Sequence, residues 1–490
     1  MTDTVHGLPA AGLTEGVEPE AGRRLRGTLG VWSIVFMVTA AASPLGVIGG
    51  PVPLGIAVGN GAGFPATYLA TGVVLLLFAV GFTALTPYVR HAGAFWAYIG
   101  AGIGRGVGLG AGFAALLSYV TLEAGVFGLI GPGLDALLVS YGAPSQPWWL
   151  YAALTFAVVS YLGYRNIDLS GKVLAIGLLA EVAIVVALDL VVVVRGGADG
   201  LSTGIVDPAA ITSGAPGLGI LFAILSFLGF EATAVFRDEA RDPERTVARA
   251  TSVSLVLITA FYAISSWALI SAVGDDRVVA EASDHGATML ADVTRDYLGT
   301  AGEHVIQVLF VTSLFACILS FHNIVARYVF TLAGGRALPA RLGVAHERHA
   351  SPHLASIATS AVVGLLILGG VIAGLDPIAE FYTWLAGFAS VGVVVLYGLT
   401  GAAVVVYFRR RPRARAAAGA WRSSVAPILG TVGLLVFLAL ILQNLTTLVG
   451  GSRPLAIGVV ALLAASFAAG PVVARRRPGV LDSAAEADPA

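Results

Sequence analysis

The segment TAAASPLGVIGGPVPLG, residues 39–55, lies inside one of the most apolar runs of the chain. A helix that only crosses a membrane does not normally carry three prolines and four glycines in so short a stretch, because both residues weaken helices. Backbone N–H and C=O groups freed at bilayer depth cost several kcal/mol each unless something satisfies them. The segment therefore predicts a helix break that lines a hydrated cavity enclosed by protein.

The composition indicates a membrane protein. Of the 490 residues, 57% are hydrophobic and only 12% are charged, whereas soluble domains carry about 25% charged residues. Apolar windows of about 20 residues, the length of a spanning helix, recur from Leu29 to Val473. The single cysteine, Cys317, excludes an intramolecular disulfide and a cysteine-based metal site. We expect an all-α polytopic membrane protein with no cofactor and no bound metal.

The apolar windows predict twelve transmembrane helices. Their expected ranges are 28–57, 62–86, 108–132, 147–164, 173–194, 216–236, 251–273, 304–334, 354–374, 381–408, 424–446 and 455–474. Cytoplasmic loops concentrate lysine and arginine, and this helix set places all but four of the 28 such residues on the side of the N-terminus. The four exceptions are Arg195, Arg277, Arg295 and Arg453. Both termini are therefore predicted to be cytoplasmic.

The longest external loop, residues 274–303, is acidic. Its residues Ala287, Leu290, Val293 and Tyr297 recur at helical spacing, which predicts a short surface helix.

A second helix break is expected five helices after the first, if the chain contains an inverted repeat. The helix predicted at 216–236 carries Ser226, Gly229 and Glu231 in its middle, although it has no internal proline. Either break alone is equally compatible with an ordinary kink, which membrane helices tolerate. Two breaks at this spacing favour a ligand site, because the ends of half-helices present partial charges to a substrate.

Three stretches resemble the amino acid–polyamine–organocation superfamily of secondary transporters. SFLGFEATAVFRDEARDPERTVARA (226–250) is similar to that family's sixth helix and following acidic loop, although Ala248 stands where a proline is usual. HAGAFWAYIGAGIGRGVGLGAGF (91–113) is similar to the entry into helix 3, and NIVARYVFTLAGGRALPARLGVAHERHASPHLA (323–355) to the end of helix 8. The resemblance covers residues 27–475.

The resemblance implies a five-plus-five inverted repeat with broken helices 1 and 6, followed by two C-terminal helices. The expected divisions are a disordered tail at 1–27, a transporter domain at 28–475 with repeats at 28–194 and 216–408 and helices 11–12 at 424–474, and a second disordered tail at 476–490.

The same resemblance places the substrate between the two breaks. The expected substrate-binding residues are Ala42, Ser43, Pro44, Leu45, Gly46, Ser226, Phe227, Gly229, Glu123 and Trp384. The family's first break usually reads Gly-x-Gly, and here it reads Pro44-Leu45-Gly46. Because proline lacks an N–H, this chain has one donor fewer for a substrate carboxylate. Whether the substrate carries a carboxylate is therefore open.

Three ionisable residues inside the predicted spans are candidates for ion or proton coupling. Glu231 matches the family's Gly-x-Glu and could exchange a proton, or be permanently bonded to freed backbone N–H groups. Glu181 could bind a cation, carry a proton, pair with His322, or bond two helices structurally. His322 could titrate near neutral pH or simply be packed.

A fourth ionisable residue, Glu123, could face the cavity and attract a substrate ammonium, or be capped by Tyr119 one turn away. Counting about 1.5 Å per residue along each helix places Glu123 nearer the outside and the other three groups in the inner half.

These features predict a permease that moves amino acids or related amines across a bacterial plasma membrane by alternating access. The coupling ion is expected to be a proton, with sodium as the alternative, and symport and exchange are both open. A polyamine or organic-cation exchanger of the same fold is the nearest alternative.

An intramembrane enzyme lacks support, because we find no HExxH pair and no paired aspartates at depth, and a channel lacks a TVGYG-like filter. The arginine-rich loop FRRRPRARAAAGAWR (408–422) indicates topology and anionic lipid, not nucleic acid. The oligomeric state is not predicted.

Overall fold

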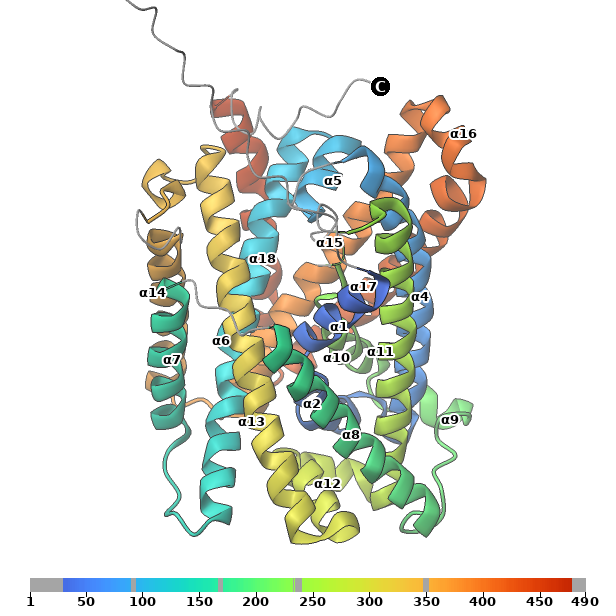
Figure 1. The fold of residues 1–490 in the computed structure, drawn as a ribbon, viewed down its shortest axis with the longest axis vertical. Helices are drawn as coiled ribbons and strands as arrows, with labels where there is room; N and C mark the ends of the chain where they lie inside the picture. The colour runs from blue at the N-terminus through green and yellow to red at the C-terminus, as the bar shows by residue number, and fades with distance from the viewer. Residues whose placement is uncertain are drawn as a thin grey trace, which may run out of the picture.

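The computed structural model describes residues 30–89, 94–165, 171–231, 233, 240–346 and 352–477. Within these ranges all the extended regular elements are helices, and they form one elongated bundle (Figure 1). The predicted tail at 1–27, all but the first two residues of the tail at 476–490, and the acidic motif around Glu239 lie outside the described residues.

The first half of the described chain contains the following helices: α1 (Val31–Ala41), α2 (Pro44–Gly49), α3 (Pro51–Leu54), η1 (Gly55–Asn60), η2 (Gly61–Gly63), α4 (Phe64–Leu85), η3 (Thr86–Tyr88), α5 (Ala94–Gly102), α6 (Arg105–Ser140), α7 (Trp148–Tyr164) and α8 (Gly171–Arg195). The second half contains α9 (Pro208–Ile211), α10 (Pro216–Ser226), α11 (Pro243–Val273), α12 (Val278–His285), α13 (Met289–Gly334), η5 (Ala340–Gly343), α14 (His353–Ile372), η6 (Pro377–Tyr382), α15 (Thr383–Arg410), α16 (Pro412–Ala420), η7 (Trp421–Val425), α17 (Ala426–Leu448) and α18 (Arg453–Arg476).

The predicted all-α membrane fold is confirmed. Ten helical stretches in the described ranges are long and apolar enough to cross a membrane. Two shorter apolar helices, α7 and α10, coincide with the fourth and sixth predicted spans. Each of the twelve predicted segments overlaps one of these helices, and the number of membrane crossings stays a prediction. The arginine-rich loop after α15 contains a short helix, α16, that we did not expect.

Glycines let three helices approach closely around the segment that precedes and opens α6. A Cβ built on Gly108 of α6 would lie 2.7 Å from Gly100 Cα in α5. A Cβ on Gly470 of α18 would collide with the backbone of Gly110 in α6. Small residues at helix interfaces allow such contact in membranes, where packing replaces the hydrophobic effect as the driving force. Gly100, Gly108 and Gly110 of this segment therefore have a structural explanation.

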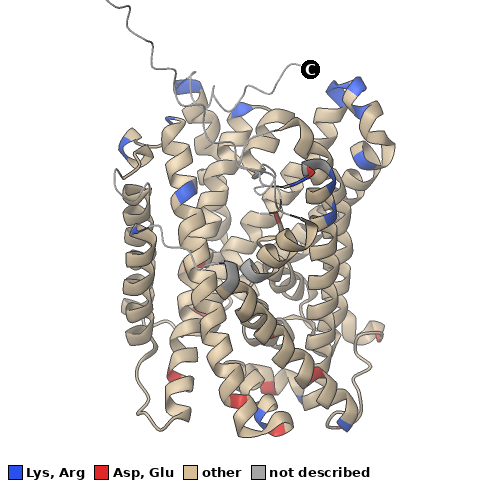
Figure 2. Ribbon diagram, viewed as in Figure 1, with Lys and Arg blue, Asp and Glu red and all other residues tan. Residues whose placement is uncertain are grey.

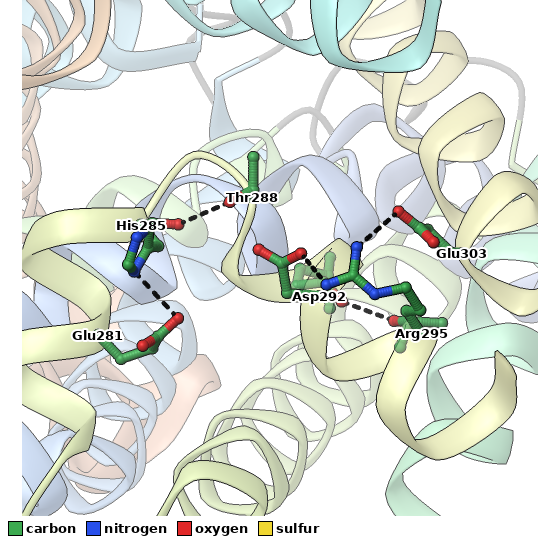
Figure 3. Close-up of polar contacts among 8 residues, drawn as sticks. Glu281, His285, Thr288, Asp292, Arg295 and Glu303 are labelled. Carbon is green, nitrogen blue, oxygen red and sulfur yellow. Dashed lines mark hydrogen bonds and ion pairs between the residues drawn. The ribbon is translucent and has the colours of Figure 1, made fainter. Parts of the chain in front are cut away.

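The expected surface helix in the acidic external loop is present as the first part of α13, with Leu290 and Val293 buried. The chain bends at Gly299, where φ is 77°, before α13 continues into the bundle. Arg295 spans this bend, since its guanidinium lies 2.8 Å from Asp292 Oδ1 and 3.5 Å from Glu303 Oε1 (Figure 3).

Charges are sorted between the two ends of the bundle (Figure 2). Most of the arginines that are drawn lie at the end that carries α16, whereas most aspartate and glutamate lie at the opposite end, around α12. This arrangement agrees with the loop assignment from the sequence. Which end faces the cytoplasm stays a prediction.

The α6–α18 contact provides a test of the close packing. Gly470→Ala should destabilise the protein by about 1–3 kcal/mol, the usual effect of overpacking, because its new methyl group meets the Gly110 backbone. Gly458→Ala on the same helix has no atom within 4 Å of the new methyl group and should be neutral or slightly stabilising. Thermal unfolding of the purified variants measures the difference; equal melting temperatures would contradict the packing.

Candidate substrate site at the two helix breaks

The first break separates α1 from α2 at Ala42 and Ser43. Ser43 adopts a left-handed conformation, with φ 50° and ψ 68°, and Pro44 begins α2. The residue before a proline avoids the α-helical region, and proline fits the first position of a helix. Pro51 begins α3 in the same way after Gly50. The prolines of the opening segment therefore divide what would be one spanning helix into short pieces.

The second break follows α10. This helix ends at Ser226, and Gly229 adopts φ 109°, which only glycine adopts readily. The two breaks are adjacent, because a Cβ built on Gly229 would lie 3.9 Å from the backbone nitrogen of Ala42. Figure 1 places α2 and α10 in the interior of the bundle.

A small pocket of about 40 Å³ lies beside both breaks. It is lined by Ala42, Ser43, Gly46, Val47, Pro51, Leu122, Val126, Leu129, Leu225, Leu228, Leu314, Cys317, Phe321 and Tyr382. None of the described residues that line it carries a charged side chain. A volume of this size holds a water or a small chemical group, so a whole substrate requires the surrounding helices to move apart.

A second cavity, of about 620 Å³, lies toward the acidic end of the bundle. It reaches Gly49 and Gly50 of the broken helix, and Leu129 lines both this cavity and the small pocket. Leu129 thus stands at the boundary between the two spaces. Trp384, predicted as a substrate residue, lines the larger cavity.

Glu181 on α8 is bonded to the start of α2. Its Oε2 accepts hydrogen bonds from Leu45 N at 3.2 Å and from Ser313 Oγ at 2.9 Å. Ser313 Oγ also lies 2.7 Å from Ser43 Oγ. The positive end of a helix dipole favours a carboxylate at this position. The contact joins α8 and α13 to the first break.

Glu231 is bonded around the second break. Its Oε2 accepts from Gly229 N at 2.9 Å and from Tyr397 OH at 3.2 Å, and its Oε1 accepts from Tyr119 OH at 2.9 Å. The tyrosines belong to α15 and α6. One buried carboxylate therefore ties the unwound segment to two neighbouring helices, and it bonds a freed backbone N–H, as one of our two hypotheses required.

Glu123 and His322 form a buried pair between α6 and α13. The carboxylate Oε1 lies 2.7 Å from His322 Nδ1, and each side chain is only 1% exposed. His322 Nε2 lies 3.0 Å from Ser356 Oγ on α14, and a Cβ on Gly163 of α7 would collide with the imidazole ring. Four helices thus meet at this histidine.

This pair corrects two expectations. Glu123 is not capped by Tyr119, because the Tyr119 hydroxyl donates to Glu231. His322 bonds to Glu123 and not to Glu181, so Glu123 and His322 share one depth and do not lie in different halves of the membrane. The depth estimates assumed helices perpendicular to the membrane, whereas both α6 and α13 exceed a spanning length, as tilted helices do.

The other predicted substrate residues divide into two groups in this conformation. Ala42, Ser43 and Gly46 line the small pocket, and Pro44 and Leu45 lie beside it in α2. Ser226 and Phe227 face away from it: the Ser226 hydroxyl lies 3.0 Å from Tyr68 OH, and the Phe227 ring packs on Tyr68 and Tyr262. Their role in binding stays a prediction.

Sequence reasoning missed Ser313 as a partner of Glu181, Tyr397 as a partner of Glu231, and Ser356 as a partner of His322. The available signal was a polar side chain within an otherwise apolar helix. Such a side chain indicates a buried contact, but the sequence does not identify the helix on which its partner lies. Within the described ranges, no group of three or more His, Cys, Asp or Glu side chains could hold a metal ion.

Two adjacent helix breaks inside an apolar helical bundle, with buried carboxylates bonded to both, define a membrane transporter with discontinuous helices. The sequence profile described as amino acid permease matches residues 29–464, and the chain belongs to this family.

The chain is similar to several bacterial transporters. It is 28% identical to an uncharacterized transporter of Mycobacterium tuberculosis over 66% of this chain and 67% of that protein. It is 23% identical to the serine/threonine exchanger SteT of Bacillus subtilis over 64% of this chain and 69% of that one. The solved structure of a manganese transporter from Eremococcus coleocola superposes with a TM-score of 0.58 at 14% identity, covering 93% of this chain and 99% of the other. The chain is thus a multi-pass secondary transporter.

The buried Glu123–His322 pair can be tested by a double-mutant cycle. His322→Gln alone should destabilise the protein by about 1–3 kcal/mol, because the buried Glu123 carboxyl loses its hydrogen-bond partner. Adding Glu123→Gln removes that carboxyl, so the double variant should lose less stability than the two single variants together. Thermal unfolding of the four proteins gives the coupling; strictly additive effects would show that the pair does not interact.

Proposed function

We propose that the chain moves amino acids or related amines across the bacterial plasma membrane by alternating access, with the substrate bound between the two breaks. The observation that carries the proposal is the adjacency of Ala42 and Gly229, which gathers the freed backbone groups of both helices beside one pocket. The family membership and the similarity to a serine/threonine exchanger support the substrate class. The sorted loop charges support two cytoplasmic termini.

A carrier fits the geometry better than a channel. The larger cavity and the small pocket are separate spaces that share Leu129 as a lining residue. Access to the pocket from that cavity therefore needs Leu129 or the neighbouring helix pieces to move. Short pieces such as α2 and α3, joined by non-helical residues, are suited to such movement because only a few backbone dihedrals must change.

We assign proton coupling to Glu231, with Glu181 and His322 as further candidate proton-binding groups. An ionised carboxylate accepts hydrogen bonds more strongly than a protonated one. Protonation of Glu231 therefore weakens its contacts with Tyr119, Tyr397 and Gly229 N, and it frees the second break from α6 and α15. Proton binding and movement of the substrate site are linked through the same three bonds.

Glu231→Gln tests this assignment in proteoliposomes. Coupling free energies are typically about 1–3 kcal/mol, or about 5- to 150-fold, so uptake driven by a proton gradient should fall by that factor while exchange of substrate across the membrane persists.

Asp189→Asn is the matched control, because Asp189 is also buried in the bundle, where it accepts a hydrogen bond from Ser265 Oγ at 2.7 Å, away from both breaks. This variant should keep the response to the gradient. Intact gradient-driven uptake in Glu231→Gln would refute the role of Glu231.

A further inference from the structure

A buried hydroxyl near the two breaks lacks a hydrogen-bond partner. Tyr262 of α11 is fully buried, and its hydroxyl forms no hydrogen bond with any residue in the described ranges. Its neighbour Tyr68, whose ring centroid lies 5.4 Å away, is bonded through its own hydroxyl to Ser226 Oγ. A buried donor without a partner costs free energy, and such groups are rare in folded proteins. The Tyr262 hydroxyl therefore calls for an explanation.

Tyr262 lies between the second break and α8. Its ring packs edge to face on Phe227, the residue that follows α10, with 6.3 Å between the ring centroids. Ser265, three residues later on α11, donates to Asp189 of α8 at 2.7 Å. Residues three apart share one face of a helix, so Tyr262 lies on the side of α11 that contacts α8. Helix α8 also carries Glu181.

Glu181 has an acceptor that its present contacts do not use. Its two hydrogen bonds, from Leu45 N and from Ser313 Oγ, both go to Oε2. None of the residues that the structure describes donates to Oε1, although each oxygen of a carboxylate can accept. Tyr262 is close enough to Glu181 for the two side chains to interact electrostatically. An unused donor and an unused acceptor thus lie in the same region of the bundle.

Movement of α2 would leave Glu181 short of a donor. Gly46 of α2 lines the pocket of about 40 Å³, which must widen to hold a whole substrate. Because Leu45 lies in the same short helix, moving α2 away from α8 separates Leu45 N from the carboxylate. A buried carboxylate that loses a donor is destabilised unless another donor replaces it. The hydroxyl of Tyr262 is available to do so.

We propose that Tyr262 is a positioning residue of the transport cycle, whose hydroxyl donates to the Glu181 carboxylate when α2 moves to admit the substrate. This inference rests on the proposed function and goes beyond it. Glu181 then has a donor in both conformations, first Leu45 N and afterwards Tyr262. Since Tyr262 also packs on Phe227, the new bond links movement at the first break to the second.

Tyr262→Phe tests the proposal, because it removes the hydroxyl and keeps the ring. The melting temperature of the purified full-length protein without substrate should stay the same or rise, since the hydroxyl forms no bond in this conformation. Counterflow is then measured in proteoliposomes with the standard amino acids, putrescine, cadaverine and phenethylamine. For each compound that the wild-type protein transports, the rate should fall about tenfold or more, the effect of losing a hydrogen bond to a charged group.

Ser254→Ala is the matched control. Ser254 is also fully buried on α11, and its hydroxyl likewise has no partner among the described residues. It lies eight residues before Tyr262, or about 12 Å along the helix, and it should leave counterflow unchanged. The double variant Tyr262→Phe with Glu181→Gln identifies the partner. If the two side chains bond during transport, its loss of rate should be smaller than the product of the two single losses.

Each outcome supports or overturns the inference. Wild-type counterflow in Tyr262→Phe would overturn it and leave the proposed function in place. A lower melting temperature of this variant, or its failure to fold, would show that the hydroxyl already has a partner in the substrate-free protein, and would overturn it as well. Multiplicative losses in the double variant would exclude Glu181 as the partner. If the wild-type protein transports none of these compounds, the proposed function fails and the inference with it.

Discussion

The structure depends on one constraint: peptide groups freed from a helix inside a membrane must find partners in the protein. The chain frees them at two places, around Ser43 and around Gly229, and brings these places together. A carboxylate then meets each break, Glu181 at Leu45 N and Glu231 at Gly229 N. Each break is thus stabilised by a carboxylate, whose charge a proton can neutralise. The hydrogen bonds that satisfy the freed peptide groups are therefore the same contacts through which we propose proton coupling.

The buried carboxylates differ in what they connect. Glu231 and Glu181 each join a break to neighbouring helices, so a change in their charge acts directly on the breaks. Glu123 pairs with His322 among α6, α7, α13 and α14, with no contact to either break. Asp189 joins α8 to α11 through Ser265. Glu181 and Glu231 are therefore candidates for residues whose contacts change during transport, whereas Glu123 and Asp189 stabilise helix packing in this conformation.

Much of the fold could be predicted from the sequence, because length, apolarity and proline or glycine content act locally. The spans, the breaks near Pro44 and Gly229 and the external surface helix all follow from such local signals. The pairing of side chains between helices could not be predicted from such signals, because it depends on how each helix is tilted and rotated in the bundle. His322 was placed at a different depth from Glu123, yet the two are bonded. One of the two hypotheses for Glu123 has it capped by Tyr119 on the same helix, yet the Tyr119 hydroxyl donates to Glu231.

The central claim is that substrate binds in the pocket between the breaks, and the chain's single cysteine, Cys317, lines that pocket. The most direct measurement is the rate at which a small membrane-permeant thiol reagent modifies Cys317 in proteoliposomes, with and without a transported compound. The account predicts that saturating substrate slows this modification, because the substrate occupies the space in front of the thiol. An unchanged rate at saturation would contradict it.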